Sequence, residues 1–169
     1  MPRSLVWLML LTALSACANV PLTAAELTQT PQLVELTLAD DHDKLVALSQ
    51  WQGRPLLLFL FSTSDTASQL ALTHLEHWLI HVRPVRVLGI ALQPDARLFL
   101  APYRDALSVS FPLMYDPQNQ ILPGRSDLGR CDVVPALVLL DAQGVERGRR
   151  YGVLTEPQLQ SFVTSSLGL

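Results

Sequence analysis

Apolar residues follow two kinds of pattern along this chain, one typical of buried strands and one typical of helices. An uninterrupted apolar run at 56–61 (LLLFLF) and a mostly apolar run at 85–92 (VRVLGIAL) predict strands that are covered on both faces. The stretch between them has helical spacing, which predicts a helix that ends at Pro84. Its recurring apolar positions are Ala71, Leu72, Leu75, Trp78, Leu79 and Val82.

The other segments predict further strands and helices in alternation. They are a hairpin within 33–50, a helix at 95–107, a short strand at 111–116, turns with some helix at 117–129, a hairpin from 135–141 and 145–152, and a closing helix at 155–169. Pro102 should interrupt or kink the first of these helices, and Thr155 should cap the last. This order predicts one α/β domain, a three-layer α/β/α sandwich whose central mixed β-sheet has helices on both faces.

The first residues have the layout of a secretory signal peptide. Arg3 precedes an apolar run from Leu5 to Leu14, which is shorter than the ~20 residues that span a bilayer. The next residues, Leu14-Ser15-Ala16-Cys17, resemble the bacterial lipobox, in which the cysteine receives a diacylglyceryl group and cleavage occurs before it. The other interpretation is a chance cysteine in an ordinary signal peptide.

A lipobox at Cys17 divides the chain into three parts. Residues 1–16 are then the signal peptide, 17–33 the lipidated cysteine and its tether, and 34–169 the domain. Several acyl chains on one cysteine make a stable membrane anchor. The next residue is Ala18, whereas an Asp there is the usual inner-membrane retention signal of Gram-negative lipoproteins. The resemblance therefore favours the outer membrane, with the domain facing the periplasm.

Charge and cysteine content narrow the chemistry. A formal net charge of -3 and a pI near 5.7 argue against nucleic acid as a partner, because phosphate binding needs a basic face. The chain has 2 cysteines. If Cys17 carries lipid, Cys131 is the only thiol left, so the exported domain has no internal disulfide.

Three segments resemble the TlpA-type branch of the thioredoxin-like superfamily. They are 36–65 (LTLADDHDKLVALSQWQGRPLLLFLFSTSD), 85–105 (VRVLGIALQPDARLFLAPYRD) and 132–152 (DVVPALVLLDAQGVERGRRYG). The likeness covers most of residues 33–167. It implies a thioredoxin-like fold, and it places Pro135 in the position of the family's cis-proline.

The redox motif of the family is the point of departure. The family has an aromatic residue, two small residues and Cys-x-x-Cys, whereas here Asp65 falls on the first cysteine and Ser68 on the second. Disulfide exchange needs a thiolate to attack and a second thiol to release the mixed disulfide. Autonomous exchange is therefore excluded. A peroxiredoxin mechanism is excluded as well, because no cysteine lies between Cys17 and Cys131.

The turn at Ser64–Ser68 has two interpretations. Ser64, Asp65 or Thr66 can cap the following helix, and Thr66-Ala67-Ser68-Gln69 matches a capping box. The turn can also retain a role in binding a ligand or partner. The loop at Val134-Pro135 also has two interpretations. The resemblance implies a strand-like backbone edge there that pairs with extended peptide, while the simpler view is that the proline preserves the fold.

Cys131 and three histidines complete the set of candidate site residues. Cys131 is either a small buried residue or a thiol close to the old redox turn. His74, His77 and His81 lie three and four residues apart on one side of the predicted helix, where imidazoles suit zinc or copper. No Cys, Asp or Glu joins them at ligand spacing in the sequence, so a solvated histidine edge is the default.

These observations favour a binding protein over an enzyme. We expect a lipid-anchored domain without a cofactor that binds an envelope protein or an extended peptide, as an assembly factor, chaperone-like module or scaffold. The surface would comprise Ser64, Asp65, Thr66, Val134 and Pro135. The enzymatic alternative is a thioredoxin-like oxidoreductase that uses Cys131 with a partner's cysteines. Metal handling by the three histidines is a second alternative.

Overall fold

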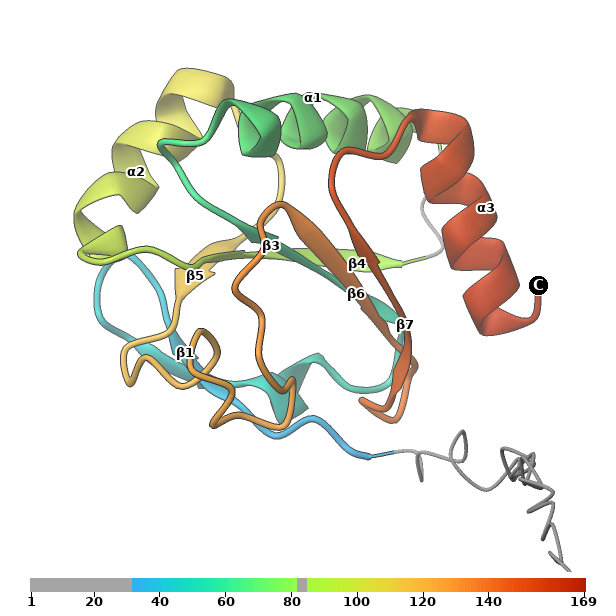
Figure 1. Ribbon diagram of the computed structural model, residues 1–169, viewed down its shortest axis with the longest axis horizontal. Helices are drawn as coiled ribbons and strands as arrows, with labels where there is room; N and C mark the ends of the chain where they lie inside the picture. The colour runs from blue at the N-terminus through green and yellow to red at the C-terminus, as the bar shows by residue number, and fades with distance from the viewer. Residues whose placement is uncertain (1–31, 82–84) are drawn as a thin grey trace, which may run out of the picture.

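The computed structural model describes residues 32–81 and 85–169, which form a single sheet covered on both faces (Figure 1). Its strands are β1 (Thr37–Ala39), β2 (Leu45–Ala47), β3 (Leu56–Phe61), β4 (Arg86–Ala91), β5 (Leu113–Tyr115), β6 (Ala136–Leu140) and β7 (Glu146–Tyr151). Its helices are α1 (Thr66–His81), α2 (Ala96–Leu107), α3 (Glu156–Leu167) and the short 3-10 helix η2 (Leu48–Trp51). The predicted signal peptide and Cys17 lie outside the described residues.

The strand order is β2-β1-β5-β4-β3-β6-β7, and the sheet is mixed as predicted. β3, β4 and β5 are parallel neighbours, whereas β6 pairs antiparallel with β3 and with β7. The chain moves from β3 to β4 to β5 in one direction across the sheet. Because such crossovers are right-handed, α1 and α2 lie on the same face.

The helices do not flank both faces of the sheet, which corrects the sequence-based expectation. Buried residues of α1, α2 and α3 all belong to one apolar cluster on one side of the sheet. The opposite cluster is closed by the segment before β1, by η2 and by the loop that leads from β5 to β6. In the described part of the chain, the third layer therefore consists of loops and a 3-10 turn.

The loop before β6 explains the difference. Residues 117–129 form turns, and the helix expected within them is absent. The Asp116 carboxylate accepts hydrogen bonds from the backbone N–H groups of Gln118 at 3.1 Å and Ile121 at 2.8 Å. A side chain thus satisfies amides that a helix would pair with carbonyls. Ile121 and Leu128 are still fully buried beneath this loop.

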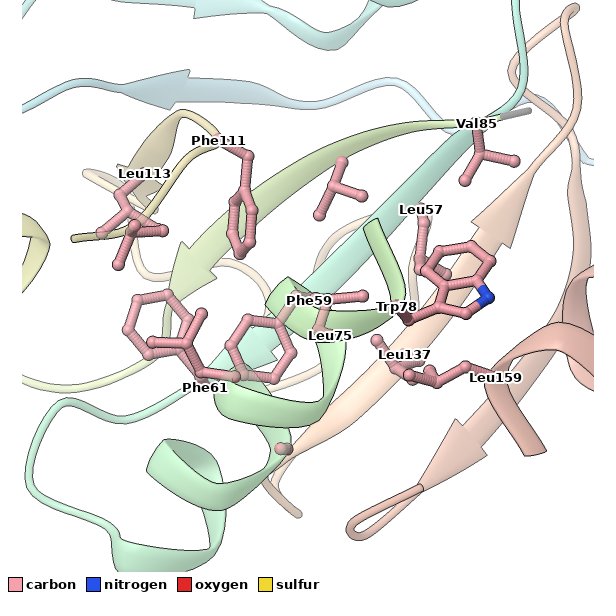
Figure 2. Packing of buried hydrophobic residues seen from close by; sticks show 14 of the residues in the cluster. Leu57, Phe59, Phe61, Leu75, Trp78, Val85, Phe111, Leu113, Leu137 and Leu159 are labelled. Carbon is pink, nitrogen blue, oxygen red and sulfur yellow. The ribbon is translucent and has the colours of Figure 1, made fainter. Parts of the chain in front are cut away.

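The helix-covered face is built on β3, which is buried along its whole length. The rings of Phe59 and Phe61 stack with centroids 5.1 Å apart. Figure 2 shows Leu75 of α1 beside Phe59, while Trp78 lies nearer Leu137 and Leu159. Since a helix with this spacing packs on a continuous apolar strand, the pattern in the sequence was sufficient to predict this layer.

Two predictions about helix ends and breaks have different outcomes. The sequence predicts an interruption or a kink at Pro102, and the interruption is wrong, because α2 continues through this residue. Proline removes one helical hydrogen bond, and here the ring is exposed, so water can solvate the freed carbonyl. The cap at Thr155 is confirmed. Its side chain and that of Gln158 form a reciprocal capping box, with the Thr155 N–H donating to Gln158 Oε1 at 2.9 Å.

Candidate functional site

The turn between β3 and α1 is closed by a hydrogen-bonded pair, Asp65 and Ser68. The Asp65 carboxylate accepts from the Ser68 hydroxyl at 2.7 Å and from the Ser68 backbone N–H at 2.8 Å. The Ala67 N–H donates to the same carboxylate at 3.4 Å. Asp65 is therefore the cap of α1. The predicted capping box from Thr66 to Gln69 is wrong, because the free N–H groups at the start of the helix donate to Asp65, one residue before Thr66.

Ser68 is the residue around which the turn is fixed. It is completely buried, and its hydroxyl accepts a hydrogen bond from the Ser62 N–H at 3.2 Å while donating to Asp65. The hydroxyl and the backbone N–H of Ser68 hold the pKa of Asp65 below its usual range. The start of α1 thus carries a negative charge on Asp65 that is already hydrogen-bonded to Ser68.

Gln93, which follows β4, fixes the other end of the turn. Its Oε1 accepts from the Thr63 N–H at 2.6 Å and from the Ser62 hydroxyl at 3.0 Å. Sequence reasoning did not identify Gln93. The sequence did contain a signal, namely a polar residue that follows a buried strand. Because the parallel strands β3 and β4 end at the same edge of the sheet, such a residue lies near the turn that follows β3.

Tyr103 of α2 lies beneath the turn and was also missed. Its ring stacks on Phe61 with centroids 5.3 Å apart, and its hydroxyl is buried without a hydrogen-bond partner. Burial and the nearby charge of Asp65 raise the pKa of Tyr103 to about 12. The hydroxyl is thus held in its neutral form.

Pro135 lies at the same end of the sheet as this turn. Leu60 pairs with Ala136, so the next residues along the two strands, Phe61 and Pro135, are also close. The Val134-Pro135 bond is cis, as the family resemblance implied. The Pro135 carbonyl accepts from the Gly152 N–H at 2.8 Å. The structure therefore brings together the two segments that the sequence proposed as one surface.

Cys131 does not join this surface. It is fully buried in the cluster beneath the β5–β6 loop, whereas Phe61 and Tyr103 belong to the cluster on the opposite face. Burial raises the pKa of the Cys131 thiol, which makes the thiolate scarcer at neutral pH. The prediction of a small buried residue is confirmed.

The three histidines lie on α1 as expected, but their nitrogens do not converge. His74 Nδ1 donates to the Leu154 carbonyl at 2.9 Å, and His77 Nδ1 lies 3.7 Å from a Glu156 carboxylate oxygen. No acidic residue joins them at ligand spacing in the sequence, but Glu156 of α3 lies near His77 in space. Sequence spacing could not reveal a ligand 75 positions or more away.

An acidic turn between β1 and β2 is the other group of metal-type ligands in the described ranges. Asp40, Asp41 and His42 bring three ligand atoms within 4.8 Å of one another, the only such group there. Asp41 is already paired with Arg104 at 2.6 Å, and Asp40 accepts from the N–H groups of His42 and Lys44. These contacts agree with the turn chemistry expected of such residues.

No helix within 32–81 and 85–169 has the length and apolarity needed to cross a bilayer. The proposed anchor at Cys17 precedes these residues, so the structure neither includes nor tests it.

The comparisons with known proteins give a fold and no sequence family. No protein-family model matches the chain, and no curated protein sequence matches it. A putative thiol:disulfide interchange protein DsbE from Chlorobium tepidum has a similar structure, with a TM-score of 0.66 at 15% identity over 82% of this chain and 97% of its own. A putative electron transfer protein from Aquifex aeolicus reaches 0.67 at 14% identity, over 82% of this chain and 94% of its own.

A surface lipoprotein has a similar structure as well. The pneumococcal exposed lipoprotein thioredoxin from Streptococcus pneumoniae gives a TM-score of 0.62 at 14% identity, over 78% of this chain and 98% of its own. Sequence identities in this range establish a shared fold only. The chemistry of this chain has to be argued from its own residues. The chain has the thioredoxin-like fold, with Asp65 and Ser68 at the start of its first long helix.

Proposed function

We propose that this is a lipid-anchored, periplasm-facing binding domain that does not exchange disulfides. It binds an envelope protein or an extended peptide at the surface formed by Ser64–Thr66 and Val134-Pro135. The observation that carries the proposal is the closed pair of Asp65 and Ser68, in which the Ser68 hydroxyl donates a hydrogen bond to the Asp65 carboxylate at 2.7 Å. An aspartate cannot form a mixed disulfide, and this one is committed to holding the helix cap.

The burial of Cys131 supports the same conclusion. Disulfide exchange requires a thiolate that can reach a partner's sulfur, and Cys131 is 0% exposed. The alternative that this thiol works with a partner would require the β5–β6 loop to open. Nothing in the arrangement of Ile121 and Leu128 over it favours such an opening.

A binding role has support in the backbone before β6. In the described part of the chain, residues 132–134 form no backbone hydrogen bond with other segments, and Val133 is 53% exposed. Unpaired backbone next to an exposed apolar side chain is suited to pairing with an extended chain. Tyr151, which pairs with Ala136 at this end of the sheet, is also half exposed.

The location rests on the N-terminal sequence. A lipobox-like cysteine, the absence of Asp after it, and a structural neighbour described as an exposed lipoprotein all agree with anchoring in the cell envelope. Labelling cells with a radioactive or clickable fatty acid tests this. We expect label on the wild type and none on Cys17→Ala. Equal labelling of both would overturn the anchor.

Insulin reduction by dithiothreitol tests the loss of redox activity. We expect the wild type and Cys131→Ser to give the same rate as dithiothreitol alone. Turnover above that rate in the wild type, lost in Cys131→Ser, would replace the binding proposal with the oxidoreductase alternative.

Peptide binding is tested by NMR on the isotope-labelled protein titrated with unstructured peptides. We expect the amide signals of Ser64–Thr66 and Val133–Val134 to move. The outer edge of β2 at the exposed residue Leu45 serves as an internal control, because among the described residues it pairs with no further strand and lies at the opposite end of the strand order. Shifts confined to β2, or none with any peptide, would contradict the proposal.

A further inference from the structure

A hollow of about 550 Å³ lies between the C-terminal half of α1 and the start of α3. It has two imidazoles and a carboxylate in its lining, together with an indole and two polar side chains. Its lining residues are His74, Trp78, His81, Thr155, Glu156, Pro157 and Gln160. This site lies apart from the Asp65 turn, and the proposed function does not use it.

His74 and His81 line this hollow, and His77 lies beside it on α1. His77 and His81 are separated by one helical turn, so their side chains are neighbours on the helix surface. Both residues are exposed, which leaves their imidazoles free to rotate. The α1 helix thereby offers two nitrogen ligands from one rigid element.

Glu156 supplies a carboxylate from the second helix. It is the first residue of α3, and the capping box of Thr155 fixes the backbone next to it. Its Oε1 lies 3.7 Å from His77 Nδ1, beyond hydrogen-bonding distance. Two ligands held about 2.0 to 2.1 Å from one tetrahedral ion are about 3.3 Å apart. A small rotation of either side chain would place both atoms on the same ion.

His74 adds a fixed imidazole beside this pair. Its Nδ1 is 2.9 Å from the Leu154 carbonyl, and because a carbonyl only accepts, Nδ1 carries the hydrogen. The other nitrogen, Nε2, then keeps a free lone pair. A histidine bonded to a backbone carbonyl through one nitrogen is the usual arrangement when the other nitrogen binds a metal.

We propose that His77, His81 and Glu156 bind one divalent transition-metal ion between α1 and α3, with His74 next to the site. Imidazole nitrogen and carboxylate oxygen are ligands of Zn²⁺ and Cu²⁺, and these two ions are the probes for the test. No thiolate is involved, since Cys131 is buried beneath the opposite face of the sheet.

The test uses the full chain, purified without a polyhistidine tag. Zinc binding is measured by calorimetry, and copper(II) coordination by electron paramagnetic resonance, which reports bound nitrogen directly. We expect one ion per chain, bound in the micromolar range. His77→Ala, His81→Ala and Glu156→Gln should each weaken binding by about 10-fold or more, as loss of a ligand or its support does.

A matched control is available at His42, the one histidine of the 4 that lies outside α1. His42→Ala should leave zinc affinity and the copper spectrum unchanged. Alanine is a good helix former, and His77 and His81 are exposed, so the α1 variants should fold. Circular dichroism of each variant checks this.

Three results would overturn the proposal. They are no binding in the micromolar range, unchanged affinity in the double variant His77→Ala/His81→Ala, and loss of binding in His42→Ala. None of them bears on peptide binding at the Asp65 turn, so the two proposals fail separately.

Discussion

At the residue scale, Asp65 and Ser68 determine what the start of α1 can do. The N-terminus of a helix favours negative charge, and in thiol-based redox proteins that preference lowers the pKa of a cysteine. Here the same preference stabilises a carboxylate that has hydrogen bonds to Ser68. The turn has become a structural cap, which leaves its outer side chains, Ser64 and Thr66, exposed for contact.

The charge of Asp65 predicts a loss of stability in acid. Folding lowers its pKa below 3.8, so the carboxylate stabilises the fold above that pH, and the contribution is lost as pH falls through the lowered value. At neutral pH we expect Asp65→Ala to cost about 1 kcal/mol of unfolding free energy, as lost caps do, and Asp65→Asn to cost less.

Urea unfolding from neutral pH down to about pH 2 measures this effect. The gap between the wild type and Asp65→Asn should narrow below about pH 3.8, the ordinary value for this carboxyl. A gap that stays constant with pH would show that the charge of Asp65 does not contribute.

Tyr103 predicts a second pH effect, at the alkaline end. Folding raises its pKa from 10.0 to about 12. The stabilisation is complete below pH 10 and is lost as pH rises toward 12, because the unfolded chain ionises first. The stability of Tyr103→Phe relative to the wild type should therefore increase as the pH rises from 10 toward 12. At neutral pH the two should be nearly equal, since the hydroxyl has no partner to lose.

Absorbance of tyrosinate and chemical denaturation at pH 9, 10 and 11 check the prediction for Tyr103. Tyr115 and Tyr151 remain in both proteins and give the background. If Tyr103 ionised near its ordinary value of 10.0, its burial beneath the turn would not hold.

At the element scale, the sequence was most informative where one pattern determined an element. The continuous apolar run of β3, the spacing along α1 and the cap at Thr155 each contain their own signal, and each was predicted correctly. The loop 117–129 was not, because the Asp116 side chain replaces helical hydrogen bonds, and composition does not show that competition. The interruption predicted at Pro102 was wrong for a related reason, since the effect of a proline depends on which side of α2 faces water.

The site was only partly predictable for a similar reason. Asp65, Ser68 and Pro135 occupy positions that the family resemblance identified, and the sheet brings them to one end. Gln93 and Tyr103 join them through contacts across 30 residues or more of sequence. No local pattern marks such residues, because their role arises from the packing of separate elements.

The geometry of the turn predicts that a redox motif can be introduced there. Asp65 and Ser68 are three residues apart across one helical turn, and their side-chain oxygens are in contact. The double variant Asp65→Cys/Ser68→Cys should form a disulfide under oxidising conditions. It should also reduce insulin several-fold faster than dithiothreitol alone.

The two single variants are the control for this experiment, since one cysteine cannot release a mixed disulfide. We expect them to stay at background. If mass spectrometry showed free thiols in the oxidised double variant, the proposed alignment of Asp65 and Ser68 with the cysteine pair would be incorrect.

At the scale of the whole molecule, one face of the sheet is covered by helices and the other by loops. The loop layer still excludes water, because Ile121, Leu128 and Cys131 are buried beneath it. We therefore expect Ile121→Ala to cost about 2–5 kcal/mol of unfolding free energy, as a core truncation does, although Ile121 lies in a turn.

Denaturant unfolding followed by circular dichroism measures this cost. Leu107→Ala, at the exposed end of α2, is the matched control and should change stability by less than about 0.5 kcal/mol. Equal effects of the two substitutions would mean that the loop layer is not part of the cooperative core.

The depth of Cys131 has a consequence for its reaction with oxidants. Catalysts that insert disulfides into exported chains act on sulfur that they can touch, and the described surface of this domain offers them none. Cys131 should therefore stay reduced in an oxidising compartment for as long as the loop between β5 and β6 remains closed over it.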